Sequence, residues 1–298
     1  MANIATTLDE QIAILRSRGM VINDESKAKE VLEDIGYYRL GFYWFPFEKT
    51  YPDKINRTHE FVDGTDFDDA VQLYYFDFKL RGILSYFLNR IEINFRTHLV
   101  YEASNLYKGN AHWFADSSIV DSQYIQSFES AVYTNGFKLN PAIKQHHRSH
   151  PEDRYAYAWK TIEYMTFGSV TNLYSALLDK QLKIKLANYY GIRHITVLEN
   201  YLDAIRNLRN CCAHGNVLYD FKPYRYLRRG PAHIEDPRNL QNLNGAVSVT
   251  LYMLKRISLN RYNEMRGLLI ELINHYSRNA KVAKIIREIS GLNASTIQ

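Results

Sequence analysis

Cysteine is scarce in this sequence, and the two that occur, Cys211 and Cys212, are direct neighbours. Neighbouring residues cannot close an ordinary disulfide, because the backbone holds their side chains apart, so a disulfide framework is excluded. Long apolar runs are also missing. The N-terminal segment MANIATTLDEQIAIL lacks the basic stretch and apolar core of a secretory signal, and no run of about twenty uncharged apolar residues occurs. The sequence therefore predicts a cytoplasmic protein with no membrane partner.

Glycine and proline are few for a chain of 298 residues, at 14 and 7, which disfavours collagen-like, low-complexity and turn-rich β architectures. Charge of one sign is also limited, since 37 basic and 32 acidic side chains leave a net charge of only +5. The 46% of hydrophobic residues suffice for a large core and exclude disorder as the main state. Tyrosine, with 24 residues, is abundant and suits surfaces that are partly exposed to solvent.

Helical spacing of apolar residues dominates the sequence. The clearest stripe leaves Arg81, Asn89 and Arg90 outside it and predicts a long helix over residues 66–107. The stripe consists of Leu80, Ile83, Leu84, Phe87, Leu88, Ile91 and Phe95. A second helix carries Leu198, Tyr201, Ile205, Leu208 and Cys212, and it should end near Gly215. Further helices are expected at 8–18, 25–35, 120–133, 159–190, 244–258, 261–276 and 280–290. Together they predict an all-α bundle.

Three segments lack this spacing. Residues 36–64 and 216–240 concentrate Gly, Pro, Tyr, Phe and Asp and are expected to be ordered loops. Residues 134–155 combine Asn-Gly, prolines and a His/Arg cluster, which predicts a polar excursion between helices. The aromatic block from Gly36 to Phe47 is expected to dock the N-terminal element on the bundle, because clustered aromatic side chains bury large areas.

The segment R-N-C-C-A-H, from Arg209 to His214, carries the clearest catalytic set. Asn210 and His214 are four residues apart and share a helix face, with Arg209 about 100° away. Histidine can move protons near neutral pH, and arginine can bind a phosphate and offset its charge in the transition state. Asparagine can orient either partner. The set suits phosphodiester cleavage, although the spacing alone also fits an exposed Arg209, a capping Asn210 and a His214 that is favourable at a helix C-terminus.

Several segments, in order over about residues 10–220, resemble the bacterial abortive-infection (Abi-like) family. They are G-Y-Y-R-L-G-F-Y-W-F-P-F (Gly36 to Phe47), Y-Y-F-D-F-K-L-R (Tyr74 to Arg81), I-E-I-N-F-R (Ile91 to Arg96), A-W-K-T-I-E-Y-M-T-F-G (Ala158 to Gly168) and L-R-N-C-C-A-H (Leu208 to His214). The hexapeptide R-N-C-C-A-H also resembles the Arg-polar-x-x-x-His motif of the HEPN ribonuclease superfamily.

The resemblance implies an all-α HEPN-type bundle that acts as a metal-independent endoribonuclease, as a toxin or antiphage effector. Arg209, Asn210 and His214 match the arginine, polar residue and histidine of the motif. Gly215 and Asn216 depart from relatives that carry further His or polar residues there. The implied partners are an RNA substrate, a second copy of the chain that completes the site, and an inhibitory small RNA or protein antitoxin. The expected layout is an N-terminal Abi-like element at 1–64 and the bundle at 65–298, with its basic loop and C-terminal helices.

A pair on the long helix, Glu92 and Arg96, stands four residues apart in the order that favours an ion pair. One reading is a salt bridge with no further role. In the other reading Glu92 and Arg96, together with Glu163, lie behind the catalytic set and position its groups.

A basic stretch, K-P-Y-R-Y-L-R-R, follows the motif at residues 222–229. Its cations would follow a phosphate backbone while its tyrosines stack unpaired bases, as in binding of single-stranded RNA. The candidate RNA-binding residues are Lys222, Tyr224, Arg225, Tyr226, Arg228 and Arg229, with Arg39 from the aromatic block. A solvated basic loop is the alternative, and nearness in sequence to His214 favours RNA.

A group of metal-ligand types, His146, His147, His150 and Asp153, matches no closed zinc spacing. The sequence predicts an exposed loop here, no metal and no cofactor. Two functions other than catalysis stay open. One is a non-catalytic RNA-binding regulator that binds a small structured RNA or a phage component. The other is a helical interaction module without RNA, and a net charge of +5 is too small to decide whether the protein binds RNA.

Overall fold

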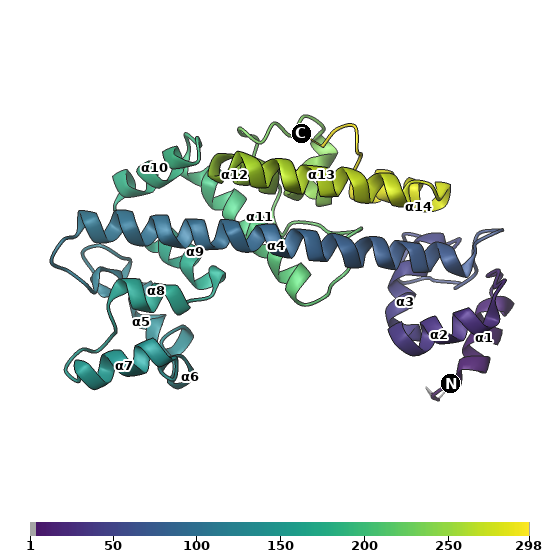
Figure 1. The fold of residues 1–298 in the computed structure, drawn as a ribbon, viewed down its shortest axis with the longest axis horizontal. Coiled ribbons are helices and arrows are strands. Elements are labelled where there is room, and N and C mark those ends of the chain that lie inside the picture. The colour runs from purple at the N-terminus through teal and green to yellow at the C-terminus, as the bar shows by residue number, and fades with distance from the viewer. Residues whose placement is uncertain (1–3, 298) are drawn as a thin grey trace.

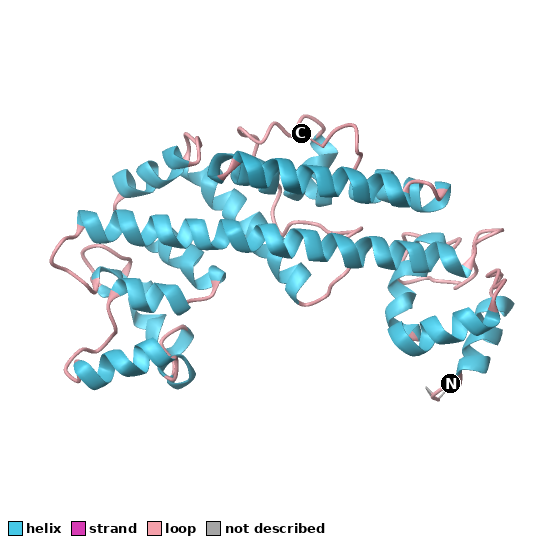
Figure 2. Ribbon diagram, viewed as in Figure 1, coloured by secondary structure: helices cyan, strands magenta, loops and turns pink. Residues whose placement is uncertain are grey.

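The computed structural model describes residues 4–297, and within them the chain is all-α, as the apolar spacing predicts (Figure 2). Only isolated β-bridges occur in this part of the chain. The α-helices, in chain order, are α1 (Leu8–Ser17), α2 (Glu25–Ile35), α3 (Tyr37–Trp44), α4 (Phe67–Leu106), α5 (Ser122–Ala131), α6 (Asn135–Lys138), α7 (Pro141–Ser149), α8 (Ala158–Tyr164), α9 (Phe167–Ala176), α10 (Lys180–Tyr189), α11 (Ile195–Ala213), α12 (Leu243–Ile257), α13 (Leu259–Tyr276) and α14 (Ala280–Ile285).

The axis of the molecule is α4, a helix of 40 residues along which the other elements are arranged (Figure 1). The helices α12 to α14 lie along one side of it, and α11 crosses it near its middle. The N-terminal helices α1 to α3 gather at its beginning, where α3 packs on it, and the segment with α5 to α8 lies near its end. This arrangement places the end of α11 against the central turns of α4.

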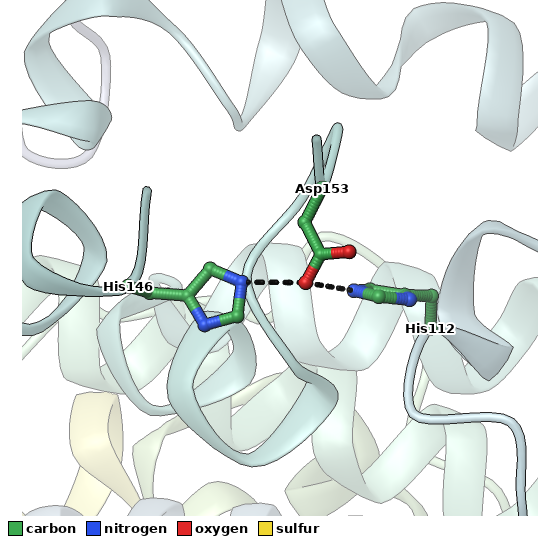
Figure 3. A group of neighbouring side chains, drawn as sticks. All are labelled: His112, His146 and Asp153. Atoms are coloured by element: carbon green, nitrogen blue, oxygen red, sulfur yellow. Dashed lines mark hydrogen bonds and ion pairs between the residues drawn. The ribbon is translucent and has the colours of Figure 1, made fainter. Parts of the chain in front are cut away.

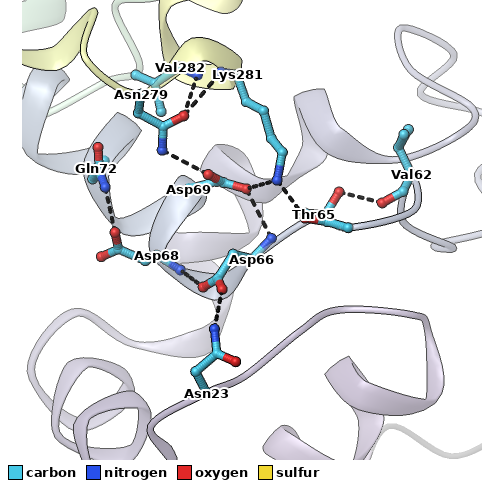
Figure 4. Close-up of polar contacts among 11 residues, drawn as sticks. Asn23, Val62, Thr65, Asp66, Asp68, Asp69, Gln72, Asn279, Lys281 and Val282 are labelled. Atoms are coloured by element: carbon cyan, nitrogen blue, oxygen red, sulfur yellow. Dashed lines mark hydrogen bonds and ion pairs between the residues drawn. The ribbon is translucent and has the colours of Figure 1, made fainter.

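The N-terminus of α4 is fixed by a capping box. The Asp66 carboxylate accepts the Asp68 N–H at 2.9 Å, and the Asp69 carboxylate accepts the Asp66 N–H at 2.9 Å (Figure 4). Asp69 also binds Lys281 and Asn279 of the C-terminal segment, at 2.8 Å each. The same carboxylate therefore caps the long helix and joins its start to the C-terminal segment.

The expected apolar stripe of α4 is buried, with Ile83 partly so. Arg81 lies outside the apolar stripe, as expected, yet it is only 7% exposed. Its guanidinium is buried because oxygen atoms from distant segments surround it, and spacing along one helix cannot reveal those partners. No helix in the described part of the chain combines the length and apolar character needed to cross a bilayer.

Three expectations about elements need correction. Residues 159–190 form α8, α9 and α10 instead of one helix, because Thr166 and Asp179 each accept backbone N–H groups as N-caps and start new helices. Residues 36–64 are not all loop, since α3 begins directly after Gly36, whose φ of +88° ends α2. Residues 134–155 contain α6 and α7. The loop expected at 216–240 holds, apart from a short 3₁₀ turn that begins at Pro237.

Candidate functional site

The motif Arg209 to His214 forms the last turns of α11 and its C-cap. The helix stops because Gly215 takes a φ of +66°, which lets the Asn216 N–H bond the Cys211 carbonyl at 2.9 Å and the Gly215 N–H bond the Cys212 carbonyl at 3.2 Å. This is a Schellman ending, in which glycine carries the left-handed residue. The expected stop near Gly215 is confirmed. Asn210 and His214 both remain exposed beside it.

The two cysteines inside the motif have no catalytic character. Cys212 is buried against α4, and burial raises the pKa of its thiol to about 12. Burial also raises the pKa of Cys211. Thiols with raised pKa values stay protonated at neutral pH and are poor nucleophiles. The chemistry of the motif therefore falls to its arginine, asparagine and histidine.

The carboxylate of Glu92 lies between two arginines. Its Oε1 accepts a hydrogen bond from Arg96 Nη2 at 2.9 Å, and its Oε2 lies 3.5 Å from Arg209 Nε. Glu92 is 8% exposed, so these charges interact with little screening. Arg96 is held in turn by the Met165 carbonyl, at 2.9 Å. The ion pair between Glu92 and Arg96 exists, and it reaches the motif through Arg209.

Glu163 is not part of this cluster. It lies on the exposed face of α8 and forms no ion pair with a described residue. The neighbouring contact to Arg96 comes from a backbone carbonyl of the following turn. Side-chain spacing cannot predict such a contact, because every residue has a carbonyl.

Two arginines hold the backbone that follows the motif. Arg39 of α3 donates to the Gly215 carbonyl at 2.5 Å, and Arg81 of α4 donates to the Asn216 carbonyl at 3.1 Å. Both carbonyls belong to the two residues that follow the C-cap of α11, so the two guanidinium groups fix the path of the chain as it leaves the helix. Arg39, expected to contact RNA, is therefore bound to the end of α11.

A buried aspartate completes this anchor. Asp77 Oδ2 accepts the Leu218 N–H at 2.6 Å and the Tyr43 hydroxyl at 3.3 Å, and lies 3.7 Å from Arg81 Nη1. Burial raises the pKa of Asp77 to about 7, against the opposing effects of the Leu218 N–H and Arg81. Burial also raises the pKa of Tyr43 to about 12. We call the set of Arg39, Tyr43, Asp77 and Arg81 the anchor cluster.

Sequence reasoning did not place Tyr43, Asp77 or Arg81 at the site. The sequence gives one local sign of Asp77 and Arg81, which is that both are charged residues among core positions of α4. Asp77 is fully buried and Arg81 nearly so. Buried charges are rare unless paired, so a charged residue at a core position of α4 marks a partner elsewhere in the chain.

The basic loop runs back along α11, away from His214. Asn207 donates to the Lys222 carbonyl at 3.4 Å, and Asn200 binds the Tyr226 carbonyl at 3.0 Å and the Arg228 N–H at 2.7 Å. Asn200 lies fourteen residues before His214, about 21 Å along a helix. The nearness in sequence that favoured a shared site is therefore not nearness in space.

The side chains of this loop are available to solvent. Tyr224 and Tyr226 are 81% and 68% exposed, and Arg225, Arg228 and Arg229 are exposed with them. The Lys222 ammonium lies 3.6 Å from Asp220. A hollow of about 570 Å³ between the loop and α11 also contains Glu199 and Asp203, so acidic groups face the arginines there. Arg225 and Arg228 line this hollow, so they lie on the same side as the acidic groups.

The histidine cluster lies elsewhere, in the segment of α5 to α8. His146 is not in an exposed loop as expected, because it sits on α7 with 1% of its surface exposed. His147 binds the Tyr133 hydroxyl at 2.8 Å. The structure instead brings His146 and Asp153 together with His112, which follows α4. Sequence spacing gave no signal for His112, since 34 residues separate it from His146.

Comparison with known proteins gives one match. A family model described as Abi-like protein matches residues 30–220. No curated protein and no solved structure matches the chain. The matched range includes α3, α4, the anchor cluster and the whole motif.

Proposed function

The chain belongs to the Abi-like protein family, and from this premise we propose that it is a metal-independent endoribonuclease of the HEPN type that acts as an abortive-infection effector. The observation that carries the proposal is the end of α11. There Asn210 and His214 face solvent, while the charged groups that hold this end, Glu92 and Asp77, are buried. Exposed reactive groups on a rigid, charged support are what transition-state stabilisation requires.

In the proposed reaction the 2′-hydroxyl of the substrate attacks the neighbouring phosphorus, and the bond from phosphorus to the 5′ oxygen breaks. The products are a cyclic 2′,3′-phosphate and a 5′-hydroxyl end. Arg209 binds the non-bridging oxygens, where charge grows. Asn210, whose Oδ1 lies 3.4 Å from Arg209 Nη1, orients the guanidinium. His214 transfers a proton as general base or general acid.

This reaction needs two proton transfers, one from the attacking hydroxyl and one to the leaving oxygen, whereas each chain supplies one motif histidine. A homodimer in which two His214 residues share a site supplies both. A face of α4 supports this assembly, because Phe78 and Tyr86 are 56% and 55% exposed and Ile93 continues their line. At 100° per residue Phe78 lies beside Arg81 and Glu92, whereas Tyr86 and Ile93 lie farther round on the solvent face of the helix. Unpartnered aromatic faces mark sites of protein association.

The cleavage proposal is tested with purified full-length chain, total RNA and analysis of the new RNA ends. His214→Ala should lower the cleavage rate by at least about 10²-fold, which is the lower range for general acid–base catalysis. Arg209→Lys should also lose activity, because an ammonium cannot bind phosphate bidentately. His275→Ala, on an exposed position of α13, is the matched control. Cleavage should persist in EDTA; complete loss in EDTA with recovery by a divalent ion would contradict the mechanism.

The dimer proposal is tested by sedimentation and by activity. Tyr86 is 55% exposed, so Tyr86→Arg places a charge on the solvent face of α4 and should shift the protein to monomer and reduce cleavage together. A wild-type monomer at micromolar concentration with full nuclease activity would refute the composite site.

A second function, non-catalytic RNA binding, is favoured by one observation: the exposed basic loop lies far along α11 from the motif and needs no catalytic group to bind RNA. An inhibitory small RNA or a phage RNA component would fit the same surface. The two functions separate in His214→Ala. Retained RNA binding with lost cleavage and lost cell toxicity supports the enzyme, whereas wild-type protein that binds RNA without cutting it supports the regulator.

A further inference from the structure

Three side chains from separate segments meet in the part of the chain between α4 and α8. His146 Nε2 lies 3.1 Å from Asp153 Oδ2, and His112 Nε2 lies 3.8 Å from the same oxygen (Figure 3). One potential ligand atom from each residue lies within 4.8 Å of the others. His112 follows the end of α4, His146 belongs to α7, and Asp153 precedes α8.

These separations are close to those of a tetrahedral metal site. Zinc binds imidazole nitrogen at about 2.0–2.1 Å and carboxylate oxygen at about 2.0–2.2 Å, so two ligands of one ion lie about 3.3 Å apart. The observed 3.1 and 3.8 Å, both measured to Asp153 Oδ2, lie near this value, and all three ligand atoms lie within 4.8 Å of one another. Rotation of the side chains would have to bring the two histidine nitrogens to the same separation.

The charge state of the cluster also suits a cation. His146 has no exposed side-chain surface, and its Nε2 faces the Asp153 carboxylate. Neutral imidazole is the form that binds metals. Asp153 supplies the negative charge, and its side chain is 21% exposed, which leaves a path from solvent.

We propose that His112, His146 and Asp153 bind one Zn²⁺ ion, with water at the fourth position. Two nitrogens and one carboxylate oxygen favour zinc over magnesium and calcium, which prefer oxygen ligands. This proposal replaces the expectation of no metal, which rested on an exposed loop and did not include His112. It concerns structure, because the cleavage groups lie on a different segment and use no metal.

The expected role of the ion is to hold together the lobe of residues 107–157, which contains α5 to α7. The buried residues of this lobe include Phe114, Phe128 and Tyr155. Such a small core gains much from a bond that joins its beginning to its end. Zinc would make that bond, since His112 lies near the start of the lobe and His146 and Asp153 lie near its end.

Two contacts set the expected affinity. His112 Nε2 now bonds the Tyr155 carbonyl at 2.8 Å and must exchange this bond for the metal. His146 Nδ1 is buried and has no hydrogen-bond partner among the described residues, so no outer group fixes its tautomer. Loss of such an outer contact typically weakens metal binding by about 10- to 100-fold. We therefore expect a micromolar dissociation constant, weaker than that of a closed four-ligand site.

The test uses the full chain, stripped with EDTA and then freed of chelator, titrated with Zn²⁺ by calorimetry and followed by thermal unfolding. Wild type should bind one Zn²⁺ per chain. At free Zn²⁺ about 100-fold above the dissociation constant, the ratio of folded to unfolded protein should rise about 100-fold, and the Tm with it. Hydrogen exchange should slow within residues 107–157.

His112→Gln and Asp153→Asn are the main variants, because both side chains are partly exposed and both substitutions keep polar groups of similar size. Each should abolish the zinc-dependent Tm rise, whereas His147→Gln should retain it. Zinc binding that is absent in wild type, or unchanged in both main variants, would overturn the proposal. RNA cleavage is measured in parallel in EDTA below the Tm of the metal-free chain, so a failed zinc site and a failed nuclease give separate results.

Discussion

Replacing Asp77 with asparagine is expected to change how the stability of the protein depends on pH. Burial raises the pKa of this carboxyl from 3.8 to about 7. Between these pH values the folded chain keeps a proton that the unfolded chain has released. The free energy of unfolding therefore falls as pH rises through this window, and the loss ends above the folded-state pKa. Each pH unit is worth about 1.4 kcal/mol, so the contribution between pH 5 and pH 7 is about 3 kcal/mol.

The measurement is urea unfolding of wild type and Asp77→Asn at pH 5 and pH 8. The dependence of the unfolding free energy on urea concentration must be the same for both proteins, so that their free energies can be compared. Asparagine keeps an oxygen that can accept the Leu218 N–H and the Tyr43 hydroxyl, but it cannot titrate. From pH 5 to pH 8 wild type should lose about 3 kcal/mol relative to the variant. Asp63→Asn, at an exposed position, should show no such change.

Arg81 has the opposite effect to burial on the pKa of Asp77, so the alternative outcome can be told apart from the expected one. Its guanidinium lies 3.7 Å from Asp77 Oδ2 and favours the ionised form. If that interaction outweighed burial, the pKa of Asp77 would lie below 5, and the difference between wild type and variant would be constant from pH 5 to pH 8. A constant difference would refute the reasoning that desolvation dominates in the anchor cluster.

Other perturbations follow from the same contacts. Glu92→Gln removes the charge between two arginines and should lower the free energy of unfolding by about 3 kcal/mol, because a buried charge loses its partner. Urea unfolding at pH 7 measures this change. An unchanged free energy of unfolding would contradict the pairing. Gly215→Ala should cost about 1–2 kcal/mol, since φ is +66° and the new Cβ would lie 3.2 Å from Arg39 Nη2; an unchanged midpoint would contradict it. Arg225→Ala with Arg228→Ala should reduce the salt slope of single-stranded RNA binding by about 1.4, or 0.7 for each lost phosphate contact; an unchanged slope would exclude the loop from the RNA surface.

Much of the fold follows from local pattern. The helix predicted over residues 66–107 matches α4 to within one residue at each end, and Asp66 caps its start. The end of α11 is predicted for a similar reason, since glycine at the position after the cap allows the left-handed turn. In both cases the determinant lies within a few residues of the structure that it fixes.

The burial of polar side chains could not be predicted where its determinant is distant in the sequence. Arg81 and Asp77 are buried because they bind backbone groups more than a hundred residues away, at Asn216 and Leu218. His146 is buried beside His112, which belongs to another segment. A polar residue looks like a surface residue until its partner is known, so periodicity alone places it wrongly.

The five segments that resemble the Abi-like family are more informative together than the pattern of each one alone. Each of the five contributes a group to the contacts around the end of α11, and the groups are Arg39, Asp77 with Arg81, Glu92 with Arg96, the Met165 carbonyl, and Arg209. Burying a charge is costly unless it is paired, so a chain gains nothing from placing several buried charges around a helix end that only needs to stop. Glycine alone would stop it. The additional charges fix the direction of Arg209 and the backbone after His214, as the proposed cleavage reaction would require.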